Sequence, residues 1–150
     1  MKKSQRIQVI VDLKADQEQK ALQALGEEQR RHQEMFDQIE HLTHYRQEYL
    51  EKFSTLGDAG MNIHQLQEFR AFVQKLDAAI AGQKQSLQAV EDELLKKRKI
   101  WLQANQKTQS LQKVQDTALR AEQAQVEKQE QKEQDERASR SGRSNGMDNA

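Results

Sequence analysis

The histidines are the side chains of this sequence that come closest to a metal-binding group. His41 and His44 are three residues apart, so on a helix they would share one face and could bind the same ion. A zinc site needs at least three protein ligands, and no such set accompanies this pair. We therefore interpret both histidines as solvated side chains, and we expect no metal site and no cofactor.

The usual catalytic motifs are missing from the sequence as well. It contains no cysteine, no glycine-rich phosphate loop and no G-x-S-x-G nucleophile motif. No cluster of carboxylates is placed where a fold could enclose a substrate. We therefore expect a protein that is not an enzyme and has no catalytic residues.

Charge and apolar content limit the partners. The 24 basic and 24 acidic residues cancel and are interspersed, which argues against nucleic-acid binding through phosphate neutralisation. No run approaches the roughly 18 apolar residues of a membrane span, and the basic N-terminus is not followed by a signal-peptide pattern. We expect a cytoplasmic protein that binds no nucleic acid and does not itself insert into a membrane.

The elements that must position any binding residues are helices. The 150 residues include no proline and only six glycines, while Gln, Glu, Lys, Ala and Leu are abundant. Only 35% of the residues are hydrophobic, which is too little for an ordinary globular core but enough for helices with one apolar stripe. The composition therefore predicts an all-α fold.

Each half of the chain carries an apolar seam with the alternating three-four spacing of coiled coils. The first seam is incomplete, and we interpret His32 within it as a polar residue that loosens or registers the coiled coil. The second seam is nearly continuous. The first consists of Leu22, Leu25, Gln29, His32, Phe36, Ile39, Thr43, Arg46, Leu50 and Phe53, and the second runs Leu66, Phe69, Val73, Leu76, Ile80, Gln83, Leu87, Val90, Leu94, Lys97, Trp101, Ala104, Thr108 and Leu111.

A glycine-containing break at residues 57–62 separates the two seams, and Asn62 is placed to cap the helix that follows. Because a helix with one apolar stripe needs a partner, we expect a long antiparallel two-helix coiled-coil hairpin. A turn centred on residues 58–60 would set Leu50 level with Phe69. The expected boundaries are a hairpin over residues 1–137, with helices over 4–56 and 63–137, and a disordered tail over 138–150.

A second stripe runs beside the seam in each arm, close to the turn. It contains two tyrosines, whose rings combine an apolar body with a polar tip. Since two helices cannot bury two stripes against each other, we expect one exposed protein-binding patch; packing of a third helix from another copy of the chain is the alternative. The stripes are Gln38, Leu42, Tyr45 and Tyr49 in the first arm and Phe72, Leu76, Ala79 and Gln83 in the second.

On these residues the chain resembles the family of the bacterial flagellar export protein FliJ. Length, two-helix layout and turn position agree over nearly the whole chain. The resemblance rests on Leu42-x-x-Tyr45-Arg46-x-Glu48-Tyr49 before the turn, on Phe69-x-x-Phe72-Val73-x-x-Leu76-Asp77-x-Ala79-Ile80 after it, and on a Lys/Arg-rich stretch that leads to Trp101.

Proteins of this family look like the central coiled coil of rotary ATPases. The resemblance implies a stalk whose two chain ends enter and stimulate a hexameric, FliI-like export ATPase, and which also handles export chaperones. It implies that the patch of eight residues named above binds the cytoplasmic domain of an FlhA-like export gate, with Gln83 in place of the family's histidine. It also implies peripheral association with the inner membrane through the export apparatus.

Two other functions remain compatible with the sequence. One is the corresponding stalk of a virulence type III secretion system, which shares this architecture. The other is a self-associating structural coiled coil that has no ATPase partner.

Overall fold

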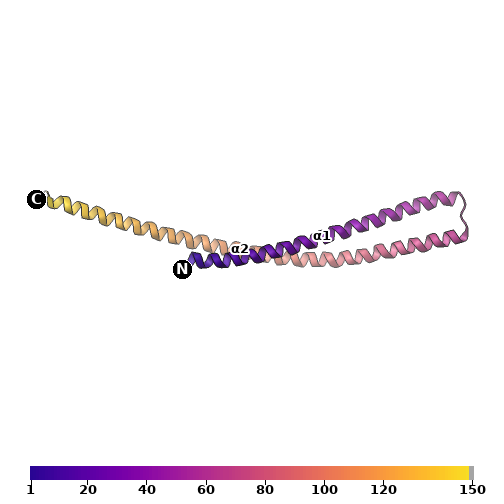
Figure 1. The fold of residues 1–150 in the computed structure, drawn as a ribbon, viewed down its shortest axis with the longest axis horizontal. Coiled ribbons are helices and arrows are strands. Elements are labelled where there is room, and N and C mark those ends of the chain that lie inside the picture. Colours follow the sequence, from indigo (N-terminus) through magenta and orange to yellow (C-terminus); the bar gives the residue numbers. More distant parts are fainter. Residues whose placement is uncertain (149–150) are drawn as a thin grey trace. The chain divides into compact units, whose positions relative to one another are not determined.

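The computed structural model of the protein describes residues 1–148, which form two long helices (Figure 1). Helix α1 spans Lys3–Asp58 and helix α2 spans Ile63–Asp148; within the described range there is no β-strand. The prediction of an all-α fold with two helices packed as a coiled-coil hairpin is confirmed. Neither helix has a stretch, among the residues described, that is long and apolar enough to cross a membrane.

The connection between the helices is shorter than expected and begins later in the chain. Helix α1 continues to Asp58, so that the loop consists of residues 59–62. Gly60 has a φ of 91°, a left-handed conformation that favours glycine. Asn62 caps α2 as predicted, because its Oδ1 accepts a hydrogen bond from the Gln65 N–H at 2.8 Å. The Gln65 side chain accepts one from the Asn62 N–H at 3.2 Å, which completes a capping box.

The chain forms two compact units. Unit 2 is Gln19–Gln103 and contains the loop together with the adjoining parts of both helices. Unit 1 combines Met1–Glu18 with the chain from Ala104 onward. Each unit therefore contains one segment from α1 and one from α2.

A heptad seam holds unit 2 together, and its least exposed apolar side chains are Leu25, Ile39, Leu76 and Ile80. On α2 the predicted seam positions are correct, since all of them are buried or half-buried. On α1 every second predicted position as far as Thr43 is wrong by one residue. The inward side chains are Ala21, Glu28, Met35 and Leu42, instead of Leu22, Gln29, Phe36 and Thr43; nearer the loop, Tyr49 and Leu50 are both half-buried.

The two arms of unit 2 are also shifted by about one helical turn from the predicted register. Phe69 stacks on Phe53 with ring centroids 3.3 Å apart, whereas Leu50 was expected at that level. The ion pair between Arg46 Nε and Asp77 Oδ1, at 2.5 Å, has the same shift. The physical reason is the late loop, because extending α1 to Asp58 moves the centre of the turn along the chain.

Polar side chains occupy the middle of this seam. His32 is half-buried, as its predicted seam position requires, and its Nε2 lies 3.2 Å from Glu91 Oε1. Glu28 is buried, and its Oε1 lies 3.1 Å from Arg31 Nη1 and 3.8 Å from Lys97 Nζ. Polar residues at seam positions set the register and oligomeric state of coiled coils at a cost in stability.

Unit 1 has a thin apolar seam that is supplemented by polar contacts between its two segments. Among the described residues of unit 1, Val11 is the apolar residue whose side chain is buried. Asn105 Nδ2 donates a hydrogen bond to Glu18 Oε1 at 2.7 Å. At the start of α1, the Ser4 hydroxyl and the Ser4 N–H donate to the two carboxylate oxygens of Glu122, at 2.6 and 3.1 Å. Glu122 therefore caps α1 from the other helix.

These bonds predict a pH-dependent opening at the N-terminus of α1. The two hydrogen bonds from Ser4, hydroxyl first, hold the pKa of the Glu122 carboxyl below its ordinary value of 4.5. A carboxyl whose pKa is lowered by folding contributes stability above its unfolded pKa and loses that contribution as the pH falls through the folded value. The protection of the Ser4 amide, measured by NMR as its exchange rate relative to the intrinsic rate at the same pH, is expected to fall as the pH drops below 4.5 and through the folded pKa. Glu122→Gln should show fast exchange already at pH 7; equal rates in both proteins would contradict the cap.

Helix α2 extends beyond its predicted end at Arg137 and is helical as far as Asp148. The residues concerned continue a proline-free run of helix formers, with hydrogen bonds such as that from Gln131 Nε2 to Asp135 Oδ1 at 3.2 Å. Every side chain from Gln123 to Arg143 is exposed, so no packing supports this helix. That the tail is disordered in solution stays a prediction, and its last residues, 149–150, lie outside the described residues.

Candidate protein-binding surface

The heptad geometry of unit 2 divides its surface into two flanks. In an antiparallel pair of helices, the g positions of both helices lie along one side of the seam and the e positions lie along the other. Ile39 and Arg46 occupy heptad position a on α1, so the g positions of this helix are Gln38 and Tyr45. On α2 the g positions are Phe72 and Ala79. We call the side that carries Gln38, Tyr45, Phe72 and Ala79 the g flank.

The eight residues that the sequence assigned to a binding patch fall into two classes. Four of them are seam residues: Leu76 is buried, and Leu42, Tyr49 and Gln83 are half-buried. For Leu42 and Tyr49 the expectation of a stripe separate from the seam is therefore wrong, because the α1 seam is in a different phase; Leu76 and Gln83 lie at seam positions of α2 that the sequence had already assigned. The other four form the g flank, where Gln38, Tyr45 and Ala79 are exposed and Phe72 is half-buried.

A ladder of aromatic rings joins the seam to the g flank. Tyr49 lies against two rings of α2, with centroid distances of 5.3 Å to Phe69 and 4.6 Å to Phe72. Tyr45 contacts the same Phe72 edge-on at 6.2 Å, with an interplanar angle of 81°. Tyr49 thus contributes to packing, whereas Tyr45 is 48% exposed and can offer its ring to a partner.

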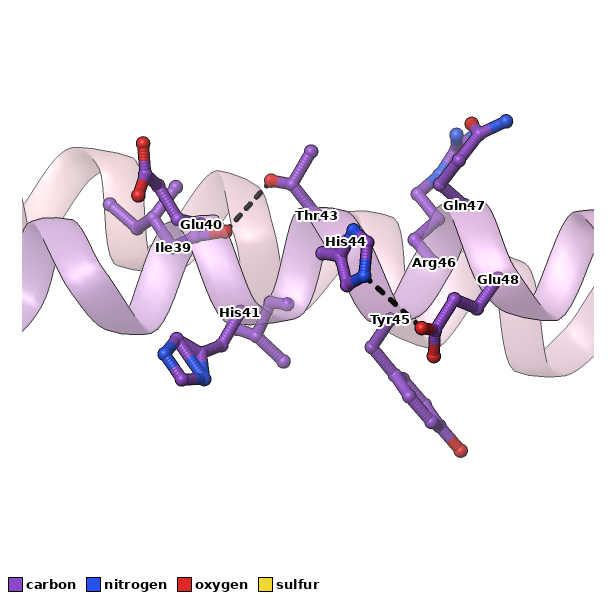
Figure 2. Close-up of a pocket in the computed structure, with 10 residues that line it drawn as sticks. Ile39, Glu40, His41, Thr43, His44, Tyr45, Arg46, Gln47 and Glu48 are labelled. Carbon is purple, nitrogen blue, oxygen red and sulfur yellow. Dashed lines mark hydrogen bonds and ion pairs between the residues drawn. The ribbon is translucent and has the colours of Figure 1, made fainter.

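Polar side chains surround Tyr45 on α1 (Figure 2). His41 and Tyr45 project to the same side of the helix. His44 Nε2 lies 3.1 Å from Glu48 Oε1, and the Thr43 hydroxyl donates to a backbone carbonyl one turn earlier at 2.8 Å. An exposed aromatic ring with a polar rim is a common arrangement at protein interfaces.

The same region contains a hollow that is open to solvent and lined by residues 39–48 of α1. Within the range that the structure describes, no three His, Cys, Asp or Glu side chains are grouped so that they could hold a metal ion. An open hollow along one helix does not enclose a small ligand. The geometry therefore fits a surface for another protein.

The sequence did not identify the flank opposite the g flank, because Leu22, Phe36 and Leu50 were assigned to the seam. These three residues are the e positions of α1, and Leu22 and Phe36 are exposed. Leu25 and Ile39, which are buried and two heptads apart, belong to the predicted and to the observed seam alike, so their spacing does not distinguish the two phases. The burial of Glu28 between them, which the sequence does not reveal, sets the phase.

A comparison with known protein families identifies a family for this chain. The family described as Flagellar FliJ protein matches residues 2–146, which is nearly the whole chain. No curated protein and no solved structure matches the chain at a significant level. The family match covers α1, the loop, α2 as far as residue 146 and the entire g flank.

Proposed function

The chain belongs to the flagellar FliJ protein family and is a protein associated with flagellar export, and from this premise we propose that it links two partners of the export apparatus. One partner is a hexameric, FliI-like export ATPase, which this chain stimulates. The other is the cytoplasmic domain of an FlhA-like export gate. In this role the chain is not an enzyme: ATP hydrolysis belongs to the ATPase, and the chain is held at the inner membrane only through the export apparatus. It also takes part in handling export chaperones.

The g flank of unit 2 is the surface that we assign to the gate protein. The observation that carries this assignment is Tyr45, which is exposed and is held edge-on by Phe72. Tyrosines in such positions are frequent hot spots, because their rings bring a large contact area at a small cost in conformational entropy. Gln38 and Ala79 extend the surface along the same flank, and the seam residues beneath them hold it rigid.

Unit 1 is the part that we assign to the ATPase ring. It leaves several apolar side chains exposed, including Val9 at 61%, Leu13 at 56% and Val114 at 49%. A surrounding ring would bury these side chains, which stabilises the complex in proportion to the apolar area removed from water. Two helices, each about 10 Å across, are also slender enough for an axial channel.

The family match supports the flagellar apparatus over a virulence secretion system. The test of the proposal as a whole is the turnover of the cognate export ATPase, together with capture of the gate domain, with and without this chain. A chain that neither changes turnover nor retains the gate domain would contradict it.

The two tyrosines are expected to have separable effects. Tyr45→Ala removes an exposed ring, so it should weaken binding of the gate domain about 30-fold, the effect of a hot spot of roughly 2 kcal/mol, and leave the melting temperature nearly unchanged. Tyr49→Ala removes a ring stacked in the seam and should lower the melting temperature. Calorimetric titration and thermal melts followed by circular dichroism measure the two effects.

Glu27→Ala is a matched control, because Glu27 is also exposed on α1 but belongs to neither flank and lies outside residues 39–48. It should leave both the affinity and the melting temperature unchanged. If Tyr45→Ala binds the gate domain as tightly as Glu27→Ala does, the g flank is not the gate-binding surface.

A further inference from the structure

The e flank of unit 2, on the side of the seam opposite the g flank, combines apolar and basic side chains in a regular repeat. On α1 it contains Leu22, Phe36 and Leu50, which are spaced two heptads apart. Leu22 and Phe36 are 42% and 43% exposed, and Leu50 is half-buried. Three apolar side chains at this spacing form a line along the helix that α2 leaves partly uncovered.

The e positions of α2 that lie nearest to these three residues are all basic. The observed register, set by the stack of Phe53 on Phe69, brings Arg70, Lys84 and Arg98 to within one helical turn of Leu50, Phe36 and Leu22, respectively. All three cations are exposed, and within the described residues none has an ion pair or a hydrogen bond to another side chain. Each apolar residue of the flank is therefore accompanied by a free positive charge.

The acidic residues of the same flank have partners inside unit 2. Asp77 and Glu91 are the e positions of α2 that lie between the three cations. Asp77 pairs with Arg46 of α1 at 2.5 Å, and Glu91 lies 3.2 Å from His32. Because three cations without partners stand beside these two partnered carboxylates, the flank has a net positive charge.

We propose that the e flank is a second docking surface and that it binds an acidic amphipathic helix of another protein. The apolar stripe of such a helix covers the line of Leu22, Phe36 and Leu50, which turns the two-helix seam locally into a three-helix bundle. Its carboxylates lie beside Arg70, Lys84 and Arg98, where charge complementarity selects the partner and orients it. Since the g flank is on the other side of the seam, this chain can hold a gate protein and a helical partner together.

Two other occupants fit the flank less well. A membrane surface would need a broad apolar face, whereas here the apolar residues form one line with cations only on its α2 side. A second copy of this flank would bring like charges together, because all the free charges on it are basic.

The test uses the full chain and a fluorescein-labelled synthetic helix of four heptads, with leucine on one face and glutamate on both edges. A second peptide has lysine in place of every glutamate. The acidic peptide should bind and the basic peptide should not, as measured by fluorescence anisotropy at low salt. The triple variant with Arg70→Glu, Lys84→Glu and Arg98→Glu should have an affinity for the acidic peptide that is lower by at least about tenfold. It should also bind the basic peptide.

A matched control carries the same change of charge on the outer face of α2, with Lys75→Glu, Lys96→Glu and Lys99→Glu. It should keep its preference for the acidic peptide, and circular dichroism should show that both triple variants remain helical. If the affinity for the acidic peptide falls equally in the two triple variants, the loss is caused by the change in net charge and the proposal is wrong. Two further outcomes would also overturn the proposal. One is sedimentation that shows the wild-type chain as a dimer and only the e-flank variant as a monomer. The other is binding of anionic lipid vesicles, in place of the peptide, through Arg70, Lys84 and Arg98.

Discussion

Deletion of residues 112–150 is expected to abolish stimulation of the export ATPase and to leave binding of the gate domain intact. The deleted part supplies most of the α2 segment of unit 1, including Glu122, which caps the N-terminus of α1. Residues 3–10 would then have no partner helix and would fray, because a helix in water depends on packing. Unit 2 keeps its own seam and its g flank. ATP turnover by the cognate ATPase, measured with the full and the shortened chain, checks the prediction.

Val9→Gln combined with Leu13→Gln tests the same surface without shortening the chain. Both side chains are exposed, so the double variant should fold normally yet stimulate the ATPase less. In the full chain, amides of unit 1 should become protected from hydrogen exchange when the ATPase is added. Full stimulation by the deleted chain, or protection that appears at residues 59–62 instead, would show that the ring does not bind unit 1.

Phe69→Ala is expected to lower the free energy of unfolding by about 3 kcal/mol, the lower end of the range for buried phenylalanines, since this ring is half-buried. The ring stacks on Phe53 and contacts Tyr49, so its removal leaves a gap at the loop end of unit 2. Urea denaturation followed by circular dichroism measures the loss.

Leu50→Ala is the control for the register. Leu50 lies on the e flank, where truncation removes only partly covered apolar surface, and the expected loss is about 1 kcal/mol. A loss as large as that of Phe69→Ala would mean that Leu50 packs in the seam, as the turn centred on residues 58–60 would have placed it.

Much of this protein follows from its sequence because the relevant signals are local. The absence of proline and the few glycines predict long helices, and Gly26 and Gly82 do not interrupt them. The second seam could be read correctly because apolar residues occupy most of its three-four positions in a single phase over residues 66–111. The break before Asn62 predicted the hairpin, and the motif around Tyr45 and Tyr49 pointed to the family that the family match confirms.

The orientation of the candidate site was decided only by the tertiary structure. On α1, apolar residues occur at neighbouring positions, with Met35 beside Phe36 and Tyr49 beside Leu50. From hydrophobicity alone Phe36 is assigned to the seam, whereas packing against α2 places Met35 there and leaves Phe36 exposed. Which residues are hidden and which flank is exposed therefore depends on the partner helix.

The register of the arms was not determined by the sequence either. A heptad seam repeats, so two antiparallel helices can slide by about one turn and still bury apolar residues against each other. The choice among these registers is made by where the loop begins and by contacts such as Phe53 with Phe69 and Arg46 with Asp77. Those contacts join residues far apart in the chain, and a local pattern of spacing contains no information about which distant side chain will lie opposite.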